Sequence, residues 1–295
     1  MKIKLISLLY SIVIAACVID IASARTWNWN FSNWNKYKKD PSTKSAKWLE
    51  AWGMKNGKGW SWPSLSGSQK NHAIVKDPAA GGSDYVLRVV YPNGSSNPGS
   101  QPQGGIGFSA EPVKLTEAVK TVQLEYKVFF PKNFKFVKGG KLPGLYGGQQ
   151  HCSGGNDAIN CFSSRFMWRS NGMGEVYAYL PDTDQRDGLC DVKNNVCNPK
   201  YGYSLGRGAW TFKTGRWTTV VQKLVMNTPG KPNGRVTVYV NGRKVYEDKK
   251  IACTKTKVTI YLVFHSFFGG NGKSWATPAK QYTYFKGFVL TAYDH

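Results

Sequence analysis

Short runs in which apolar and polar residues alternate recur along most of the chain. The clearest is VQLEYKVFF, residues 122–130, in which Leu124 and Tyr126 fall on one side and Gln123 and Lys127 on the other. A period of two is typical of a β-strand with one face buried. The pattern therefore predicts a strand in which the even positions point into a core.

Similar runs follow between breaks rich in glycine and proline, and no helical period of useful length interrupts them. Asn241-Gly242 separates two of the runs and predicts a two-residue hairpin. The runs cover residues 217–226, 235–240, 243–247, 257–268 and 282–290. Many strands without helical spacers favour an all-β fold, an antiparallel β-jelly roll or β-sandwich. The polar stretch 91–105 fits a loop that crosses the open face of a sheet, so we expect one domain over residues 25–295.

The first 24 residues have the pattern of a secretory signal peptide. Lys2 and Lys4 precede an apolar run over residues 5–18, and Ala-Ser-Ala ending at Ala24 fits a cleavage site. A membrane anchor is the alternative, but the apolar run is short for a bilayer span. We therefore expect a secreted protein that begins at Arg25. Two sequons are glycan-acceptor candidates, at Asn30 and Asn93.

The charge is strongly positive, with 40 Lys and Arg against 17 Asp and Glu and a net charge of +23. Removal of the signal takes away one net positive charge. Such an excess implies an anionic partner, and secretion favours an acidic polysaccharide over nucleic acid or an acidic membrane. The charge is spread along the chain without a nucleic-acid recognition motif. We expect no nucleic-acid partner, no membrane segment in the mature chain, and a monomer.

Five cysteines remain after the signal, and an oxidising compartment allows disulfides between them. Proximity in the sequence favours two short loops and a free Cys253, although other connectivities are open. No CxxC occurs and the histidines are scattered, so we expect neither a metal site nor another cofactor. The pairing that proximity favours is Cys152 with Cys161 and Cys190 with Cys197.

One predicted hairpin, residues 163–180, carries polar side chains on a single face. A three-residue loop at 171–173 would place Arg165 opposite Tyr179 and Arg169 opposite Glu175. Other registers are open, but alternation keeps the polar residues on one surface in each of them. That surface receives Ser163, Arg165, Arg169, Tyr177 and Tyr179.

A solvated sheet face is the ordinary explanation for such residues. Tyrosines beside arginines are poor choices for mere solubility, and the upstream GGKLPG adds Lys141 in what the sequence suggests is a loop. Arg and Lys bind carboxylates, and a tyrosine beside cations can exchange protons. These groups suit β-elimination of a uronate, in which the carboxylate is neutralised, the C5 proton is removed and the departing O4 is protonated. A glycoside hydrolase would instead need a pair of carboxylates, and Glu175 is the sole acid in this hairpin.

Four segments together resemble polysaccharide lyase family 14, which contains alginate lyases of molluscs and algal viruses. They are YPNGS…GGIGF, KGGKLPGLYGG, SSRFMWRSNGMGEVYAYLP and GRGAWTFKTGRWTTVVQKLVMNTPG, and the resemblance runs from Asp84 to the C-terminus. It implies a jelly roll with a concave substrate cleft, in which Lys141 neutralises the carboxylate. It also implies that Tyr177 and Tyr179 transfer protons and that Ser163 and Arg165 line the cleft.

Within this resemblance we expect Tyr179 to be the base and also the acid, with Tyr177 as the second candidate. One tyrosine can serve both steps on mannuronate, where H5 and O4 lie on the same side of the ring, so we expect a mannuronate preference. The alternatives are a glucuronan or other polyuronate lyase, and a jelly roll that binds acidic glycans without cleaving them. Further candidate binding residues are Arg169, Gln149 and His151. His265 is expected to be structural, and the segment 266–275 to border the cleft or join the core.

Overall fold

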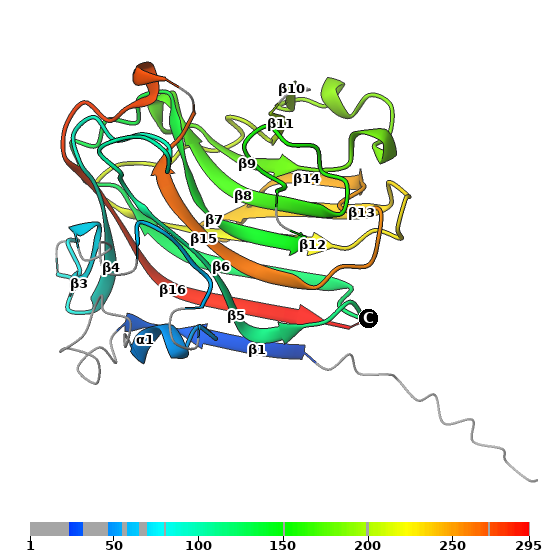
Figure 1. Cartoon of the computed structure of the whole chain (residues 1–295), viewed down its shortest axis with the longest axis horizontal. Coiled ribbons are helices and arrows are strands. Elements are labelled where there is room, and N and C mark those ends of the chain that lie inside the picture. The colour runs from blue at the N-terminus through cyan, green and yellow to red at the C-terminus, as the bar shows by residue number, and fades with distance from the viewer. Residues whose placement is uncertain are drawn as a thin grey trace, which may run out of the picture.

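The computed structural model describes residues 24–31, 47–54, 58–64, 70–79, 81–149, 151–198, 201–270 and 272–294. The predicted signal peptide, apart from Ala24, lies outside the described residues. In the described part of the chain, two antiparallel sheets of eight strands each form the protein, and helix is limited to short turns (Figure 1). This confirms the predicted antiparallel β-jelly roll. The described helices do not include one long and apolar enough to cross a membrane.

The first sheet, here called sheet A, has the strand order β14-β13-β12-β6-β16-β4-β3, and β1 pairs with β16 at its side. Its strands are β1 (Ala24–Trp29), β3 (His72–Lys76), β4 (Tyr85–Tyr91), β6 (Thr121–Phe129), β12 (Trp217–Val225), β13 (Gly234–Val240), β14 (Arg243–Ile251) and β16 (Gln281–Tyr293). The second sheet, sheet B, has the order β10-β11-β9-β8-β7-β15-β5-β2. Its strands are β2 (Trp60–Trp62), β5 (Ile106–Leu115), β7 (Gly139–Gly148), β8 (Cys161–Arg169), β9 (Gly174–Tyr179), β10 (Val196–Asn198), β11 (Gly202–Leu205) and β15 (Ile260–Phe268).

The helical turns lie between and beside these strands. They are the α-helix α1 (Lys47–Glu50) and the 3₁₀ turns η4 (Ser170–Gly172), η5 (Asp182–Asp184), η6 (Leu189–Asp191) and η7 (Lys273–Trp275).

The alternation in β6 is confirmed, because Leu124 and Tyr126 are fully buried while Gln123 and Lys127 are partly exposed. The predicted hairpin is also present. Asn241 and Gly242 join β13 to β14 with φ angles of 49° and 80°, the left-handed conformation that a two-residue turn of this kind needs.

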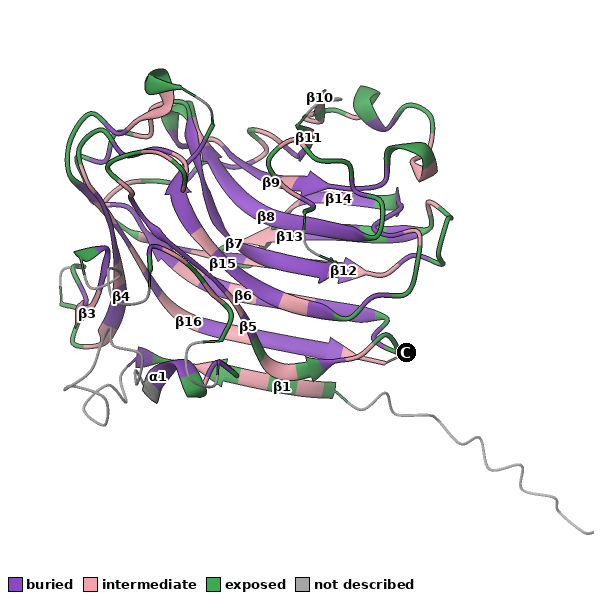
Figure 2. Cartoon of the chain, viewed as in Figure 1, coloured by how far each residue is buried: buried purple, intermediate pink, exposed green. Residues whose placement is uncertain are grey.

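Aromatic side chains fill the space between the two sheets. Most positions of the central strands are buried, as the purple strands of Figure 2 show. Phe264 of sheet B stacks on Phe108 at 4.9 Å and meets Phe285 of sheet A at 5.0 Å between ring centroids. Tyr126 of sheet A stacks on Phe288 and donates its hydroxyl proton across the core to the carbonyl of Pro143 in β7. These contacts fix the position of sheet B, which carries the site, relative to sheet A.

The prediction of a loop around Lys141 is wrong. Residues Gly139–Gly148 form β7, a buried strand between β8 and β15, and the glycines serve close packing rather than a turn. A Cβ atom on Gly140 would lie 2.0 Å from the Trp168 ring, and one on Gly147 would lie 2.3 Å from Phe162. Periodicity failed here because glycines carry no side chain to mark a face.

A β-bulge interrupts β7 next to Lys141. Lys141 pairs with Met167 and Gly144 pairs with Arg165. Between these two pairs, β7 contains one residue more than β8. Proline is tolerated at such a bulge, where the ladder lacks a hydrogen bond. The extra residue reverses the alternation, and Lys141 consequently shares the outer face with Tyr146, which pairs with Ser163.

The predicted register of the β8–β9 hairpin is displaced. Its three-residue connection is Ser170–Gly172, one position earlier than expected, with positive φ at Asn171 and Gly172. Arg165 therefore lies opposite Tyr177, and Ser163 opposite Tyr179. The displacement moves each partner by two residues, so the predicted faces are unchanged.

Candidate active site

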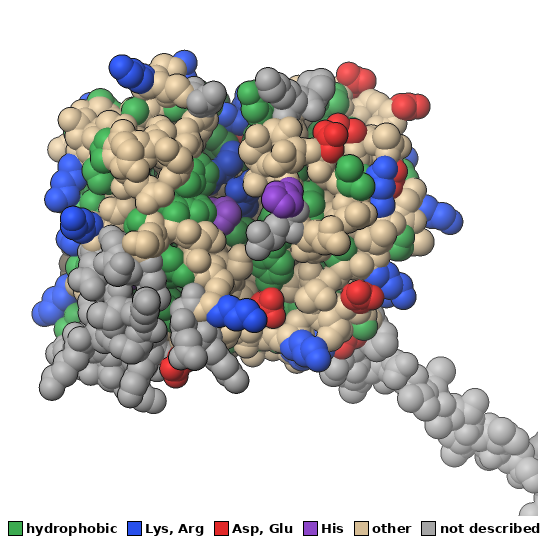
Figure 3. All heavy atoms as spheres, in the orientation of Figure 1, with side chains coloured by type: hydrophobic (Ala, Val, Ile, Leu, Met, Phe, Trp, Pro, Cys, Tyr) green, Lys and Arg blue, Asp and Glu red, His purple; other side chains and the backbone are tan. Residues whose placement is uncertain are grey.

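A groove runs over the face of sheet B that points away from the core. It consists of a first pocket of about 450 Å³ and a second pocket of about 480 Å³, which share Lys141, Tyr177, Tyr201 and Gly270. Asn97 of the polar 91–105 stretch lines the first pocket, as expected for a loop over an open sheet face. Figure 3 shows the surface hollowed between two lobes, with Lys or Arg and His side chains in the hollow.

Most of the polar face of the hairpin is buried rather than solvated, and so is Lys141 on the neighbouring strand. Ser163 is 0 %, Arg165 3 % and Lys141 8 % exposed. A wet sheet face would leave these side chains in water, so that explanation does not hold. Burial of a charge is costly unless another charge or hydrogen bonds compensate it, and such residues are therefore expected to have a function.

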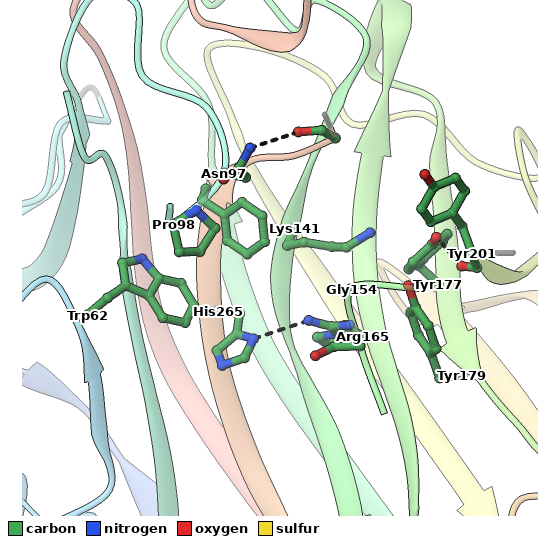
Figure 4. A pocket seen from close by; sticks show the side chains of 13 residues that line it. Trp62, Asn97, Pro98, Lys141, Gly154, Arg165, Tyr177, Tyr179, Tyr201 and His265 are labelled. Atoms are coloured by element: carbon green, nitrogen blue, oxygen red, sulfur yellow. Dashed lines mark hydrogen bonds between the residues drawn. The ribbon is translucent and has the colours of Figure 1, made fainter. Parts of the chain in front are cut away.

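Arg165 lies at the floor of the first pocket, beside His265 (Figure 4). Its Nη1 donates to His265 Nδ1 at 3.1 Å, and its Nη2 lies 3.4 Å from Ser163 Oγ. Because arginine can only donate, Nδ1 of His265 is unprotonated. Burial, followed by the charges of Arg165 and Lys141, holds the pKa of His265 well below its ordinary value, so the imidazole is neutral.

Lys141 approaches the tyrosines from the neighbouring strand. Its Nζ lies 2.9 Å from Met167 Sδ and 3.2 Å from the centroid of the Tyr177 ring. Burial, and then the nearby Arg165 and Arg169, hold the pKa of Lys141 well below its ordinary value. Among the residues that the structure describes, neither Lys141 nor Arg165 forms an ion pair with a carboxylate. Both cations lie where an incoming anion can reach them.

Tyr177 and Tyr179 face each other edge to face, with ring centroids 5.7 Å apart. The hydroxyl of Tyr177 donates to the carbonyl of Tyr201, whereas the hydroxyl of Tyr179 accepts the backbone N–H of Gly155 at 3.0 Å. Burial, followed by the neighbouring Tyr179, raises the pKa of Tyr177. Toward the backbone, the Tyr177 hydroxyl is thus a donor and the Tyr179 hydroxyl an acceptor. The two tyrosines are therefore inequivalent.

A disulfide loop holds several of these groups in place. Cys152 and Cys161 are bonded, as predicted, and so are Cys190 and Cys197, while Cys253 is free and buried. The Cys152 carbonyl accepts the hydroxyl of Ser163 at 2.7 Å, which makes Ser163 a link between this loop and Arg165. Ser163 lines neither pocket, so its contact with substrate stays a prediction.

The remaining predicted residues are divided between the groove and its surroundings. Arg169 lines the second pocket and forms an ion pair with Glu175. Gln149 and His151 are exposed in the loop beside the groove and line neither pocket. Within the described residues, no group of three or more His, Cys, Asp or Glu side chains is arranged to hold a metal ion.

Sequence reasoning missed several lining residues. His265 was expected to be structural, but it also lines the first pocket, and its place on the alternating face of β15 was the available signal. The segment 266–275 was expected to border the cleft or join the core, and both occur, because Phe267 and Trp275 line the groove while Phe268 is buried in the core. The others come from separate elements that nothing in the sequence connects; they are Trp62, Pro98, Tyr201 and Arg207.

The fold and the groove together define a β-sandwich with a buried cationic, tyrosine-lined groove on one sheet. The sequence model of the family described as Polysaccharide lyase 14 matches residues 79–288. The marine PL-14 alginate lyase from Aplysia kurodai is similar in structure, with 33 % identity, a TM-score of 0.66, and coverage of 76 % of this chain and 87 % of that one. The chain belongs to the polysaccharide lyase 14 family.

Two viral proteins are also similar. The alginate lyase vAL-1 from Chlorella virus is 25 % identical with a TM-score of 0.64, over 75 % of this chain and 89 % of that one. Exolysin of Paramecium bursaria Chlorella virus 1 is 27 % identical over 203 residues, which is 59 % of this chain. That match spans 30 % of the length of Exolysin.

The burial of Lys141 predicts a cost in stability. We expect Lys141→Met to raise the free energy of unfolding at neutral pH by about 1 kcal/mol, since it removes a buried cation that has no anionic partner. Below the lowered pKa, Lys141 is charged in both states and wild type bears the full cost. Between that pKa and 10.5, Lys141 is protonated only in the unfolded chain. The stability of the wild type therefore rises with pH, and the difference in the free energy of unfolding between Lys141→Met and wild type narrows.

Urea titrations followed by tryptophan fluorescence across this pH range measure the difference. Lys249→Met is the control, because the Lys249 side chain is 62 % exposed and its removal leaves no buried charge unpaired. A Lys141→Met protein less stable than wild type at neutral pH would show that burial of this cation is compensated.

Proposed function

We propose that this protein is a secreted alginate lyase that cleaves polyuronate chains by β-elimination. The observation that carries the proposal is the pair of buried cations, Lys141 and Arg165, that lack a carboxylate partner and lie beside Tyr177 and Tyr179 in one groove. Membership of the polysaccharide lyase 14 family and the similarity to alginate lyases support the same conclusion.

In the proposed reaction the C6 carboxylate of a uronate lies against Lys141 and Arg165. Their charge draws electrons from the carboxylate and makes the C5 proton more acidic. The anion also favours the protonated form of Lys141, whose pKa is depressed in the free protein. The cations thus gain their missing partner when the substrate binds.

Tyr179 is the proposed base, because it lines the first pocket and its hydroxyl accepts the N–H of Gly155, whereas the hydroxyl of Tyr177 donates its proton to the carbonyl of Tyr201. It removes the C5 proton, the electron pair forms the C4=C5 double bond, and the C4–O4 bond breaks. Tyr179 then returns the proton to O4, which leaves an unsaturated uronate at the new non-reducing end. Tyr177, with its raised pKa and its bond to the Tyr201 carbonyl, remains protonated and is the less suitable base.

One tyrosine that serves both steps suits mannuronate, where H5 and O4 lie on the same side of the ring. The alternative substrate is glucuronan, and a groove that binds glycans without cleaving them is the alternative from another class. Sugar geometry does not separate glucuronate from mannuronate, because the two differ only at C2 and share the positions of H5 and O4; the similarity to alginate lyases favours alginate as the substrate. Binding without cleavage is disfavoured by the inequivalent hydrogen bonds of the two tyrosines, which binding does not require.

We expect elimination to be fastest on polymannuronate, followed by the ultraviolet absorbance of the C4=C5 double bond. Tyr179→Phe is expected to lower kcat by about 10²- to 10⁴-fold, and Lys141→Ala to lower kcat/KM by about 10²-fold or more. Equal rates on polyguluronate would contradict the mannuronate preference. Flat absorbance on polymannuronate, polyguluronate and glucuronan, with glycan still bound, would leave a binding protein.

The Cys152–Cys161 disulfide is proposed to position the base. Its loop supplies the Gly155 N–H to Tyr179 and packs against Tyr179 on the outer face of sheet B. Replacing both cysteines by serine is expected to lower kcat about tenfold to 100-fold with little change in KM, since misplacement of a reacting group by about 1 Å costs as much. Serine at both Cys190 and Cys197 is the comparison, because that disulfide borders the second pocket. An unchanged kcat in a protein without the first disulfide would refute the positioning role.

Secretion is part of the proposal, with residues 25–295 as a single lyase domain and a monomer. Residues Arg25 to Trp29 of β1 pair with β16, and Arg25 forms an ion pair with Asp294 at 2.6 Å, so a chain that begins at Arg25 retains this pairing. The intact mass of protein from the culture medium should correspond to a chain starting at Arg25. Protein that stays in the cells with residues 1–24 attached would contradict it.

A further inference from the structure

The groove continues past Lys141 into the second pocket, which the proposed elimination does not use. The two pockets are similar in volume, about 450 and 480 Å³, and Lys141, Tyr177 and Tyr201 form their common boundary. A chain that occupies the first pocket can therefore extend into the second without leaving the groove.

Two arginines from different strands and loops meet in the second pocket. Arg169 ends β8, and Arg207 follows β11. Arg169 Nη2 lies 2.6 Å from Glu175 Oε1 and Arg207 Nε lies 2.7 Å from Glu175 Oε2, while both arginines also contact Ser204 Oγ. Glu175 is 0 % exposed, and its two carboxylate oxygens hold the two guanidinium groups in fixed positions on the buried side of the pocket.

The ion pairs with Glu175 leave Arg169 and Arg207 with a net positive charge and with accessible surface toward the groove. One carboxylate neutralises only one of the two arginines, and the described lining of the second pocket contains no Asp or Glu. The side chains of Arg169 and Arg207 remain 14 % and 30 % exposed, so an anion can reach them. Trp275 lies 5.9 Å from the Arg169 guanidinium and offers an aromatic face beside it.

We infer that the second pocket is a second uronate subsite, in which Arg169 and Arg207 bind the carboxylate of a further residue of the chain. This inference rests on the proposed function for its substrate class. Every residue of a polyuronate carries a carboxylate, so a chain held at Lys141 and Arg165 presents another carboxylate farther along the groove. Arginine suits this task because its planar donors bind carboxylates through two hydrogen bonds. The ring of that residue lies against Trp275.

The test measures affinity as a function of chain length, separately from catalysis. Saturated mannuronate oligomers of two to six residues are titrated calorimetrically into the Tyr179→Phe protein, which is expected to bind without cleaving. Affinity should rise about tenfold at the oligomer length that first reaches the second pocket, because one charge-assisted hydrogen bond typically changes affinity by about this factor. Adding Arg207→Gln should remove this step and leave the affinity for shorter oligomers unchanged.

Two further variants separate binding from a structural role. Arg207→Lys keeps the charge without the paired donors and should restore part of the step. Arg186→Gln is the matched control, since Arg186 also forms an ion pair with a buried acid, Asp248, at 2.7 Å but lies outside both pockets. The control should keep the full step. In the otherwise wild-type enzyme, Arg207→Gln should raise KM for the polymer about tenfold with kcat nearly unchanged.

The outcomes distinguish this inference from the proposed function. If affinity does not rise with length, or rises equally in the Arg207→Gln protein, the second pocket is not a subsite even when the enzyme cleaves polymer. If no polyuronate is cleaved and the length step still depends on Arg207, the subsite stands and the lyase proposal fails. A fall in kcat together with loss of cooperative unfolding would show that Arg207 serves only to hold Glu175.

Discussion

Burial of two cations without an anionic partner is the constraint on which the arrangement of this protein depends. Lys141 and Arg165 lie under loops on the outer face of sheet B, where water cannot solvate them fully. The fold must therefore hold them in place against the tendency of a buried charge to regain water or lose its proton. The pKa of Lys141 is lowered because its charge is buried, and the carboxylate of an acidic ligand would stabilise the charged form.

The rigidity comes from the core beneath the groove. The bulge in β7 brings Lys141 onto the outer face, and Tyr126 of the opposite sheet donates to the carbonyl of Pro143 within that bulge. The ring of Trp168 occupies the space that a side chain at Gly140 would need. The position of Lys141 is thus fixed by contacts that extend through the core to sheet A.

The two pockets of the groove hold their positive charges in different ways. In the first pocket, Lys141 lies at the boundary with the second pocket and Arg165 at the floor, both without a carboxylate partner in the described part of the chain. Tyr177 and Tyr179, whose hydroxyls have different hydrogen-bond partners, lie along its side. In the second pocket, Glu175 fixes the directions of Arg169 and Arg207 while leaving them a net positive charge. A polyanion that follows the groove would therefore meet fixed positive charge in both pockets.

The sequence by itself determined those strands whose side chains alternate clearly, and the faces of these side chains, because alternation is a local property of each segment. It assigned Arg165, Tyr177 and Tyr179 to one surface, and an error of two residues in register left that assignment intact. Pairing of the four loop cysteines also followed from proximity. Only the tertiary structure decided that Lys141 lies in a bulged strand, that Gly155 donates to Tyr179, and that Arg207 shares Glu175 with Arg169. Each of these depends on contacts between segments far apart in the chain, which no local pattern records.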